Sequence, residues 1–260
     1  MTEQFKLLVA ALTSPLVGVA IAPFVGSFLT AVIHRLPAGE LLFFARSRCP
    51  RCEVQLGIPD LVPLASWILS RGRCRHCGAE ISTSYPLIEL AALAAAVWGF
   101  ALETGWRFWP SCLLAWTLIA LAVIDWRHFI LPDVLTLPLI PVGLALAALA
   151  TPDQLGDHVI GTLVGFGTFA IIAAAYRRLR GHEGLGMGDA KLAAAAGAWV
   201  TWDGLASVVL IACIAALAVT AGRSRPGRLP SATERLPFGA YLCVGFWLVW
   251  LYGPLEIPSG

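Results

Sequence analysis

The chain has 260 residues, of which 58% are hydrophobic and 13% charged, and its mean hydropathy is +0.78. A water-soluble domain of this length would carry many more charges, so the composition excludes an ordinary soluble globular protein. The net charge is only +2, which gives no sign of a nucleic-acid-binding surface. We therefore predict an all-α fold, a polytopic membrane helix bundle.

Apolar stretches long enough to cross about 30 Å of hydrocarbon mark the candidate spans. They are 8–33, 87–104, 108–124, 134–150, 158–176, 190–201, 204–221 and 237–253. The segment 190–201 is short and rich in alanine, so the total is seven or eight. The first stretch is too long for the core of a signal peptide, and we expect no cleavable leader. Small residues are expected to allow close helix packing at Gly143, Gly161, Gly165, Gly167 and Gly197.

The basic residues are distributed unevenly between the two ends of these spans. If Met1 starts outside and the chain alternates, Lys6 and Arg107 fall outside, and the other 16 of the 18 Lys and Arg residues fall inside or at the inner boundary. This matches the positive-inside rule. We expect a first membrane span within 1–34, a cytoplasmic loop domain at 35–85, and the main membrane domain at 86–260.

The loop at 35–85 contains two Cys-x-x-Cys pairs, Cys49 with Cys52 and Cys74 with Cys77, separated by 21 residues. Four thiolates with this spacing suit tetrahedral Zn²⁺, and the reducing side of the membrane disfavours disulfides. Because the loop is too short to form its own core, the metal would supply its folding energy. We expect a structural zinc site of the zinc-ribbon type. The alternative is a set of redox-active or unliganded cysteines.

Two aspartates lie where apolar segments end on the predicted cytoplasmic side. Asp125 follows the apolar run 118–124, and Asp189 ends the run Gly186-Met187-Gly188-Asp189. A carboxylate at the edge of a bilayer is costly to leave charged and unpaired, which indicates functional groups. We predict that the two meet and share a proton, the arrangement with which an aspartyl protease activates water. The glycines before Asp189 would allow an extended substrate backbone to approach closely, or would permit a positive φ.

Each aspartate also has a simpler interpretation. Asp189 could cap the helix that follows it, and Asp125 could pair with Arg127 or lie in solvent at a helix end. Asp133 follows a proline and precedes an apolar run, so we predict that it is the N-cap of the 134–150 span rather than a catalytic group.

Two other classes of function remain open on these residues. A proton-coupled transporter could use Asp125 and Asp189 as relay groups. Transporters usually place such carboxylates near the bilayer midplane and often show inverted repeats, and no repeat is visible here. A non-catalytic, zinc-stabilised membrane scaffold is the third possibility, in which the aspartates could be replaced without consequence.

A series of short motifs extends over nearly the whole chain. In order they are Gly26-Ser27-Phe28-Leu29 through His34-Arg35-Leu36-Pro37, the two cysteine pairs, Arg71-Gly72-Arg73-Cys74-Arg75, Ile81-Ser82, Tyr85-Pro86-Leu87-Ile88-Glu89-Leu90, Ile124-Asp125, Leu131-Pro132-Asp133-Val134-Leu135-Thr136-Leu137-Pro138, Gly184-Leu185-Gly186-Met187-Gly188-Asp189-Ala190-Lys191-Leu192 and Leu236-Pro237-Phe238-Gly239. Together they resemble the bacterial type IV prepilin peptidase family. By this resemblance, Asp125 and Asp189 correspond to the catalytic pair of a GxGD-type intramembrane aspartyl protease, and Asp133 to the family's non-nucleophilic Pro-Asp.

The resemblance implies an aspartic endopeptidase that is also an S-adenosylmethionine-dependent N-methyltransferase. Its expected substrates are type IV prepilins or type II secretion pseudopilins, cut at the cytoplasmic face of the bacterial inner membrane. The expected cofactors are structural Zn²⁺ and S-adenosyl-L-methionine as methyl donor, with membrane lipid but no nucleic acid as a partner. No residue is assigned to the methyl donor, and nothing indicates the oligomeric state. Thr30 stands where the family usually has asparagine, in the region associated with methyl transfer, so proteolysis is the better supported activity.

Overall fold

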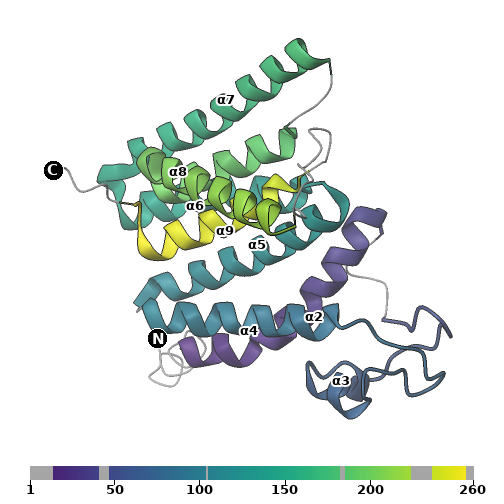
Figure 1. The fold of residues 1–260 in the computed structure, drawn as a ribbon. Coiled ribbons are helices and arrows are strands. Elements are labelled where there is room, and N and C mark those ends of the chain that lie inside the picture. The colour runs from purple at the N-terminus through teal and green to yellow at the C-terminus, as the bar shows by residue number, and fades with distance from the viewer. Residues whose placement is uncertain (1–13, 41–46, 104, 182–184, 224–235, 256–260) are drawn as a thin grey trace, which may run out of the picture. The chain divides into compact units, whose positions relative to one another are not determined.

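The computed structural model describes residues 14–40, 47–103, 105–181, 185–223 and 236–255 (Figure 1). The chain divides into two compact units, residues 1–120 and 121–260, which are described separately. Lys6, Arg46, Glu183 and the basic loop 224–235 lie outside the described residues, and so does the first part of the predicted 8–33 span.

The first unit contains α2, α4 and the N-terminal part of α5, together with the cysteine loop and its short helices η1 and α3. Their bounds are Pro15–Ala38 for α2, Ile58–Asp60 for η1, Ala65–Leu69 for α3, Ser84–Leu102 for α4, Gly105–Arg107 for η2 and Phe108–His128 for α5. A proline at the first position favours the start of α2, and Gly39, with φ of 69°, ends it. α2 and α4 pack closely because a Cβ atom on Gly26 would lie only 2.6 Å from Cα of Glu89.

The second unit contains the C-terminal part of α5 and four further helices. They are α6 (Asp133–Ala150), α7 (Leu155–Arg180), α8 (Met187–Arg223) and α9 (Phe238–Tyr252), with η3 (Pro152–Gln154) before α7. α7 lies against α8 at small residues: a Cβ on Gly161 would be 2.7 Å from the Gly197 carbonyl oxygen, and one on Gly165 would be 2.5 Å from that of Ala193. The predicted close packing is thus confirmed at these glycines and at Gly143, but it is wrong for Gly167, which faces open space.

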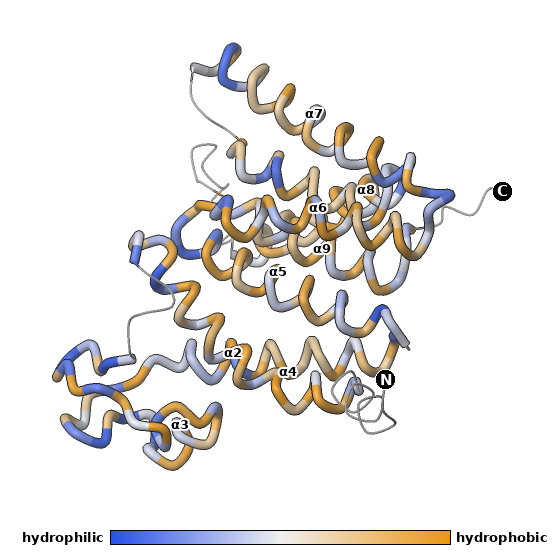
Figure 2. Tube along the Cα trace, turned by 180° about the vertical axis from the view of Figure 1, so that it is seen from behind, coloured by the Kyte–Doolittle hydropathy of each residue, from blue (hydrophilic) through white to orange (hydrophobic). Residues whose placement is uncertain are grey.

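The eight predicted apolar segments all correspond to helices. In α8 the backbone of Thr201 has φ of 66° and ψ of −179°, which are not helical values. The helix is therefore interrupted at the end of the predicted segment 190–201, before the segment 204–221. Among the described residues, six helices are long and apolar enough to cross a membrane, and α9 is a shorter apolar helix. Figure 2 shows hydrophobic residues along the helices and hydrophilic ones at helix ends and in the cysteine loop. The all-helical class is confirmed, and the chain is a multi-pass membrane protein.

Candidate active site

Asp125 and Asp189 approach the same point of the second unit. Asp125 lies in the last turn of α5 and Asp189 in the first turn of α8, and their exposed fractions are only 6% and 8%. A Cβ atom on Gly239, in the first turn of α9, would lie 3.0 Å from Oδ2 of Asp125 and 3.1 Å from Oδ1 of Asp189. The two oxygens are therefore separated by no more than about twice a hydrogen-bond length, and residue 239 has no side chain between them.

Asp125 is held by the start of α9. Its Oδ2 accepts the backbone N–H of Ala240 at 2.9 Å, and the N–H of Gly239 also hydrogen-bonds its carboxylate. The positive end of a helix dipole and two N–H donors favour an ionised carboxylate at this position. The interpretation of Asp125 as a solvated helix end is wrong, because the residue is buried.

The two carboxylate oxygens of Asp189 have different surroundings: one is bound at the start of α8, and the other faces Asp125. Its Oδ2 accepts the N–H of Gly186 at 3.2 Å, and its own N–H donates to the Gly186 carbonyl at 3.1 Å. Because α8 begins at Met187, Asp189 is its third residue and not the N-cap, so the predicted capping position is wrong; its carboxylate instead accepts the N–H of the residue that precedes the helix. The other oxygen, Oδ1, faces Gly239 and Asp125.

Leu131 fills the space beside the two aspartates and explains the glycine at 188. A Cβ on Gly188 would lie 2.9 Å from Cβ of Leu131, and one on Gly239 would lie 2.7 Å from its Cδ1. Neither Gly186 nor Gly188 has a positive φ, so that alternative is wrong. Gly188 is required for the close approach of Leu131, a contact that the sequence did not predict.

Asp133 lies outside this pair and has a different partner. It is the first residue of α6, and Pro132 is the N-cap, so the predicted cap is displaced by one residue. Both oxygens of Asp133 accept hydrogen bonds from Nζ of Lys191, at 2.6 and 2.8 Å. Sequence reasoning missed Lys191 as a partner, although it is the only basic residue between 190 and 222, an unusual position for a charge.

The four predicted cysteines of the first unit come together. Their sulfur atoms all lie within 4.8 Å of one another, and those of Cys49 and Cys77 are 3.8 Å apart. A tetrahedral zinc site with Zn–S bonds of about 2.3 Å requires S···S separations of about 3.8 Å. None of the four is in a disulfide. The cluster therefore fits a metal ion in both spacing and donor type.

The two knuckles have matching backbones. In the first, the N–H of Cys49 donates to the Val54 carbonyl at 3.0 Å; in the second, that of Cys74 donates to Ala79 at 2.8 Å. An antiparallel bridge flanks each turn, Arg48 with Gln55 and Arg73 with Glu80. The residue after each second cysteine has a positive φ, 55° at Glu53 and 70° at Gly78. The sequence therefore builds two similar turns that direct their thiols to a common point.

Hydrogen bonding already favours one thiolate. The backbone N–H groups of Cys52 and Arg51 lower the pKa of Cys49 to about 6. The pKa of Cys52 is raised to about 11, because burial and the neighbouring thiols outweigh the hydrogen bond from Val54. Four adjacent thiolates repel one another, and a bound cation removes that repulsion.

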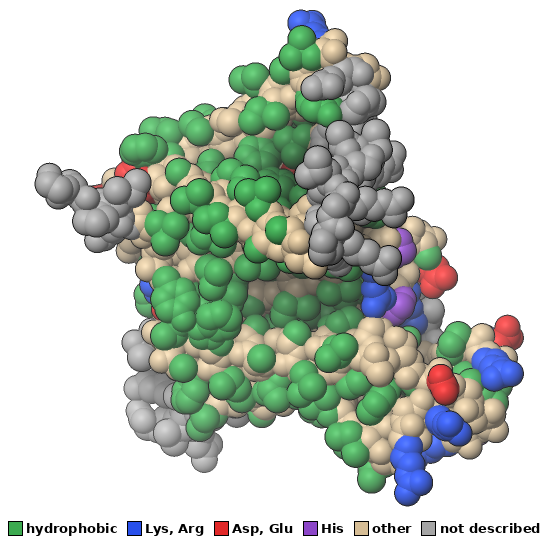
Figure 3. All heavy atoms as spheres, in the orientation of Figure 1, with side chains coloured by type: hydrophobic (Ala, Val, Ile, Leu, Met, Phe, Trp, Pro, Cys, Tyr) green, Lys and Arg blue, Asp and Glu red, His purple; other side chains and the backbone are tan. Residues whose placement is uncertain are grey.

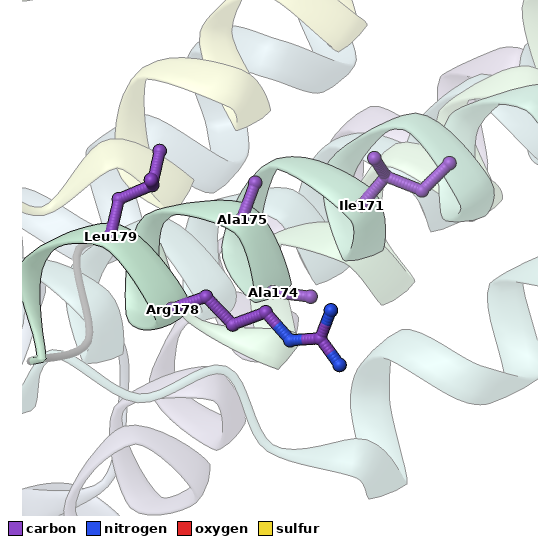
Figure 4. Close-up of a pocket in the computed structure, with 5 residues that line it drawn as sticks. All are labelled: Ile171, Ala174, Ala175, Arg178 and Leu179. Carbon is purple, nitrogen blue, oxygen red and sulfur yellow. The ribbon is translucent and has the colours of Figure 1, made fainter.

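A pocket on α7 is separate from both clusters. It is lined by Ile171, Ala174, Ala175, Arg178 and Leu179 (Figure 4). All five residues come from one face of a single helix, and neither Asp125 nor Asp189 lines it. It is a groove on one helix, separate from the aspartate pair.

Known proteins with the same sequence features identify the family. Residues 20–102 match the bacterial peptidase A24 N-terminal domain, and residues 112–221 match the type IV leader peptidase family. The chain is 38% identical over 255 residues to a prepilin leader peptidase/N-methyltransferase of Aeromonas salmonicida (strain A449), with 88% of this chain and 87% of that protein covered. The chain belongs to the type IV leader peptidase family.

Further relatives carry the same name. The one from Burkholderia pseudomallei (strain K96243) is 40% identical over 252 residues, covering 85% of this chain and 80% of that protein. The one from Aeromonas hydrophila is 37% identical over 254 residues, covering 88% and 87%. No solved structure matches. The type IV leader peptidase match contains both aspartates, and the N-terminal match contains all four cysteines of the cluster.

Proposed function

We propose that this protein cleaves the leader peptide from type IV prepilins or type II secretion pseudopilins and then N-methylates the new amino terminus. Membership of the type IV leader peptidase family and relatives named prepilin leader peptidase/N-methyltransferase support both activities. The observation that carries the peptidase assignment is the convergence of Asp125 Oδ2 and Asp189 Oδ1 beside Gly239. Nothing in the comparisons supports a transporter.

The two carboxylates would act as a general base and a general acid. Each carboxylate disfavours ionisation of the other, so the pair would hold one proton in the working enzyme. The N–H donors of α9 stabilise negative charge on Asp125, so we assign it as the base that takes a proton from water. Asp189, with one backbone donor, keeps the shared proton and hydrogen-bonds the scissile carbonyl as its oxygen becomes negative.

The methyl transfer needs a neutral amine at the new amino terminus and a donor. S-adenosyl-L-methionine would supply an electrophilic methyl group, as the name of the relatives suggests. The new amino terminus has to lose a proton before its nitrogen can attack the methyl group, so a group at the methyl-transfer site must accept that proton. No residue of the chain is assigned to the donor.

The four clustered cysteines are proposed to hold a structural Zn²⁺: Cys49, Cys52, Cys74 and Cys77. Their spacing and the similar backbone turns around each pair support this proposal. With all four ligands from protein, no coordination position remains for catalysis.

The bacterial inner membrane is the proposed location, with the active site at the cytoplasmic face. Support comes from the positive-inside pattern and from Lys191 and Arg127, which lie close in sequence to the two aspartates.

A single assay tests both activities. The purified protein in lipid is incubated with a prepilin and S-adenosylmethionine, and the product is weighed by mass spectrometry. Loss of the leader is expected, followed by the mass of a methyl group on the new amino terminus. An uncut prepilin would contradict the peptidase assignment, and a cut but unmethylated product would contradict only the second activity.

A further inference from the structure

The cysteine loop exposes large apolar side chains along one short segment, here named the 58–69 patch. Its members and their exposed fractions are Ile58 (84%), Leu61 (42%), Val62 (40%), Ile68 (65%) and Leu69 (76%). Side chains of this kind gathered on a small domain usually mark a surface that is covered by a partner. Figure 3 shows hydrophobic side chains on the cysteine loop as well as on the helices of the first unit.

The patch is tied to a membrane-spanning helix. The backbone N–H of Leu64, in the middle of the patch, donates to Oε2 of Glu89 at 2.8 Å. Glu89 lies in α4 and is 6% exposed. In Figures 1 and 2, α3 lies near the N-terminal end of α4.

The length of α4 gives the depth of this contact. α4 has 19 residues, and at 1.5 Å per residue it is about 28 Å long, close to the thickness of the hydrocarbon layer. If α4 crosses the layer along its normal, Ser84 lies near the hydrocarbon boundary, and Glu89, five residues further along, lies about 7 Å inside it. The Leu64 backbone, bonded to the end of the Glu89 side chain, would then lie within one side-chain length of that depth, in the range at which interfacial helices bury their apolar faces.

Glu89 provides the hydrogen-bond acceptor that the Leu64 backbone N–H needs inside the hydrocarbon layer. In a bilayer every backbone N–H needs a partner, because no water is available. Leu64 has φ of 60° in a tight turn closed by the hydrogen bond from Ala65 N–H to the Pro63 carbonyl, which leaves its own N–H without a partner in the turn. The Glu89 carboxylate accepts that N–H and also hydrogen-bonds the Ser27 side chain.

The positive charge of the cysteine loop indicates that an anionic lipid surface is the partner of the patch. Residues 47–81 contain five arginines and three acidic residues, and all five arginines are exposed: Arg48, Arg51, Arg71, Arg73 and Arg75. One of them, Arg75, pairs with Asp60 at 3.3 Å. Anionic lipids of the cytoplasmic leaflet attract arginines beside a membrane span. The patch also continues the lipid-facing surface of α4, where Leu87 is 61% and Leu90 48% exposed.

We propose that the 58–69 patch is inserted into the cytoplasmic leaflet, with its apolar side chains among the acyl chains and the neighbouring arginines at anionic headgroups. The cysteine loop is then an interfacial element held against the membrane at two places, the Glu89 contact and the lipid. It is not a soluble domain suspended above the bilayer.

Photo-crosslinking of the full-length protein tests this. The variant Leu69→p-benzoylphenylalanine is reconstituted in vesicles of phosphatidylethanolamine and phosphatidylglycerol, irradiated, and analysed by mass spectrometry for attached phospholipid. The matched control is His76→p-benzoylphenylalanine, at an exposed position of the second knuckle. Retained leader cleavage by both variants shows that they are folded. Lipid adducts severalfold more abundant at position 69 than at 76 are expected.

The other outcomes overturn the proposal. Adducts at position 69 that contain a second polypeptide would show that a protein covers the patch. Equal lipid labelling at both positions, or none at position 69, would show that the patch is not inserted. A further variant, Ile68→Ser with Leu69→Ser, should increase hydrogen exchange of residues 58–69 in vesicles, and exchange unchanged from the wild type would also contradict the insertion.

Discussion

At the scale of single residues, Asp125 and Asp189 face one another because residue 239 has no side chain. Gly239 contributes its N–H to the Asp125 carboxylate and leaves the space in which both carboxylates lie. Leu131 closes one side of that space by contact with Gly188 and Gly239. The proposed catalytic geometry therefore depends on two glycines as much as on two acids.

Gly239→Ala should lower the rate of leader cleavage roughly 10–100-fold, because the added methyl group displaces Leu131 or a carboxylate. The matched control is Gly156→Ala. Gly156 is also the second residue of a helix, α7, but has open space around it. Cleavage of a prepilin by each variant in the same lipid is the measurement, and equal rates for the two would contradict this geometry.

The roles of these residues could be predicted from the sequence only in part. The edge position of Asp125 and Asp189 in apolar segments indicated two working carboxylates, and the structure brings them together. Gly239 and Leu131 could not be predicted from local pattern, because their contacts join segments 50 or more residues apart. For Gly188, the sequence indicated a need for space but not that Leu131 occupies it.

At the scale of helices, the pair Asp133–Lys191 joins the start of α6 to the first turns of α8, two residues beyond Asp189. Sequence pattern predicted all the apolar segments, since long hydrophobic runs determine helices in a membrane. It also placed a boundary between 201 and 204, next to the interruption of α8 at Thr201, but it could not predict this ion pair, which joins residues 58 apart in the chain. The cap predicted at Asp133 lies one residue earlier, at Pro132, and the Asp133 carboxylate binds Lys191.

Lys191→Asp should destabilise the second unit, because it places two acidic groups side by side. Its effect should be on the order of 1 kcal/mol, since both side chains are partly exposed and such pairs are worth about 0.2–1 kcal/mol. The double variant Asp133→Lys with Lys191→Asp should regain most of the lost stability. Thermal unfolding in detergent is the measurement, and additive effects of the two changes would show that the residues do not interact.

At the scale of the whole molecule, the two proposed sites belong to different compact units. The four cysteines lie in residues 1–120, and Asp125, Asp189 and Gly239 lie in 121–260. The cysteine spacing was enough to predict the cluster, because two knuckles define a tetrahedral site with little help from the rest of the fold. The attachment of the loop to Glu89 was not visible in the sequence.

Removal of the metal should therefore act on the first unit. The protein is expected to bind about one Zn²⁺ per chain through the four thiolates. A strong chelator, or Cys49→Ser, should release it and increase hydrogen exchange of residues 47–81, while residues 187–200 keep their protection. Metal analysis and hydrogen exchange by mass spectrometry give the result, and unchanged exchange of 47–81 after metal loss would contradict a structural role.

The central claim is that Asp125 and Asp189 together perform the cleavage. The most direct measurement compares prepilin cleavage by Asp125→Asn and Asp189→Asn with that by Asp133→Asn, all three membrane-inserted and at equal amounts. Asparagine keeps the size of each side chain but can neither take nor give the proton. Cleavage should be abolished in the first two variants and largely kept in the third. Cleavage at the wild-type rate by either of the first two would contradict the account.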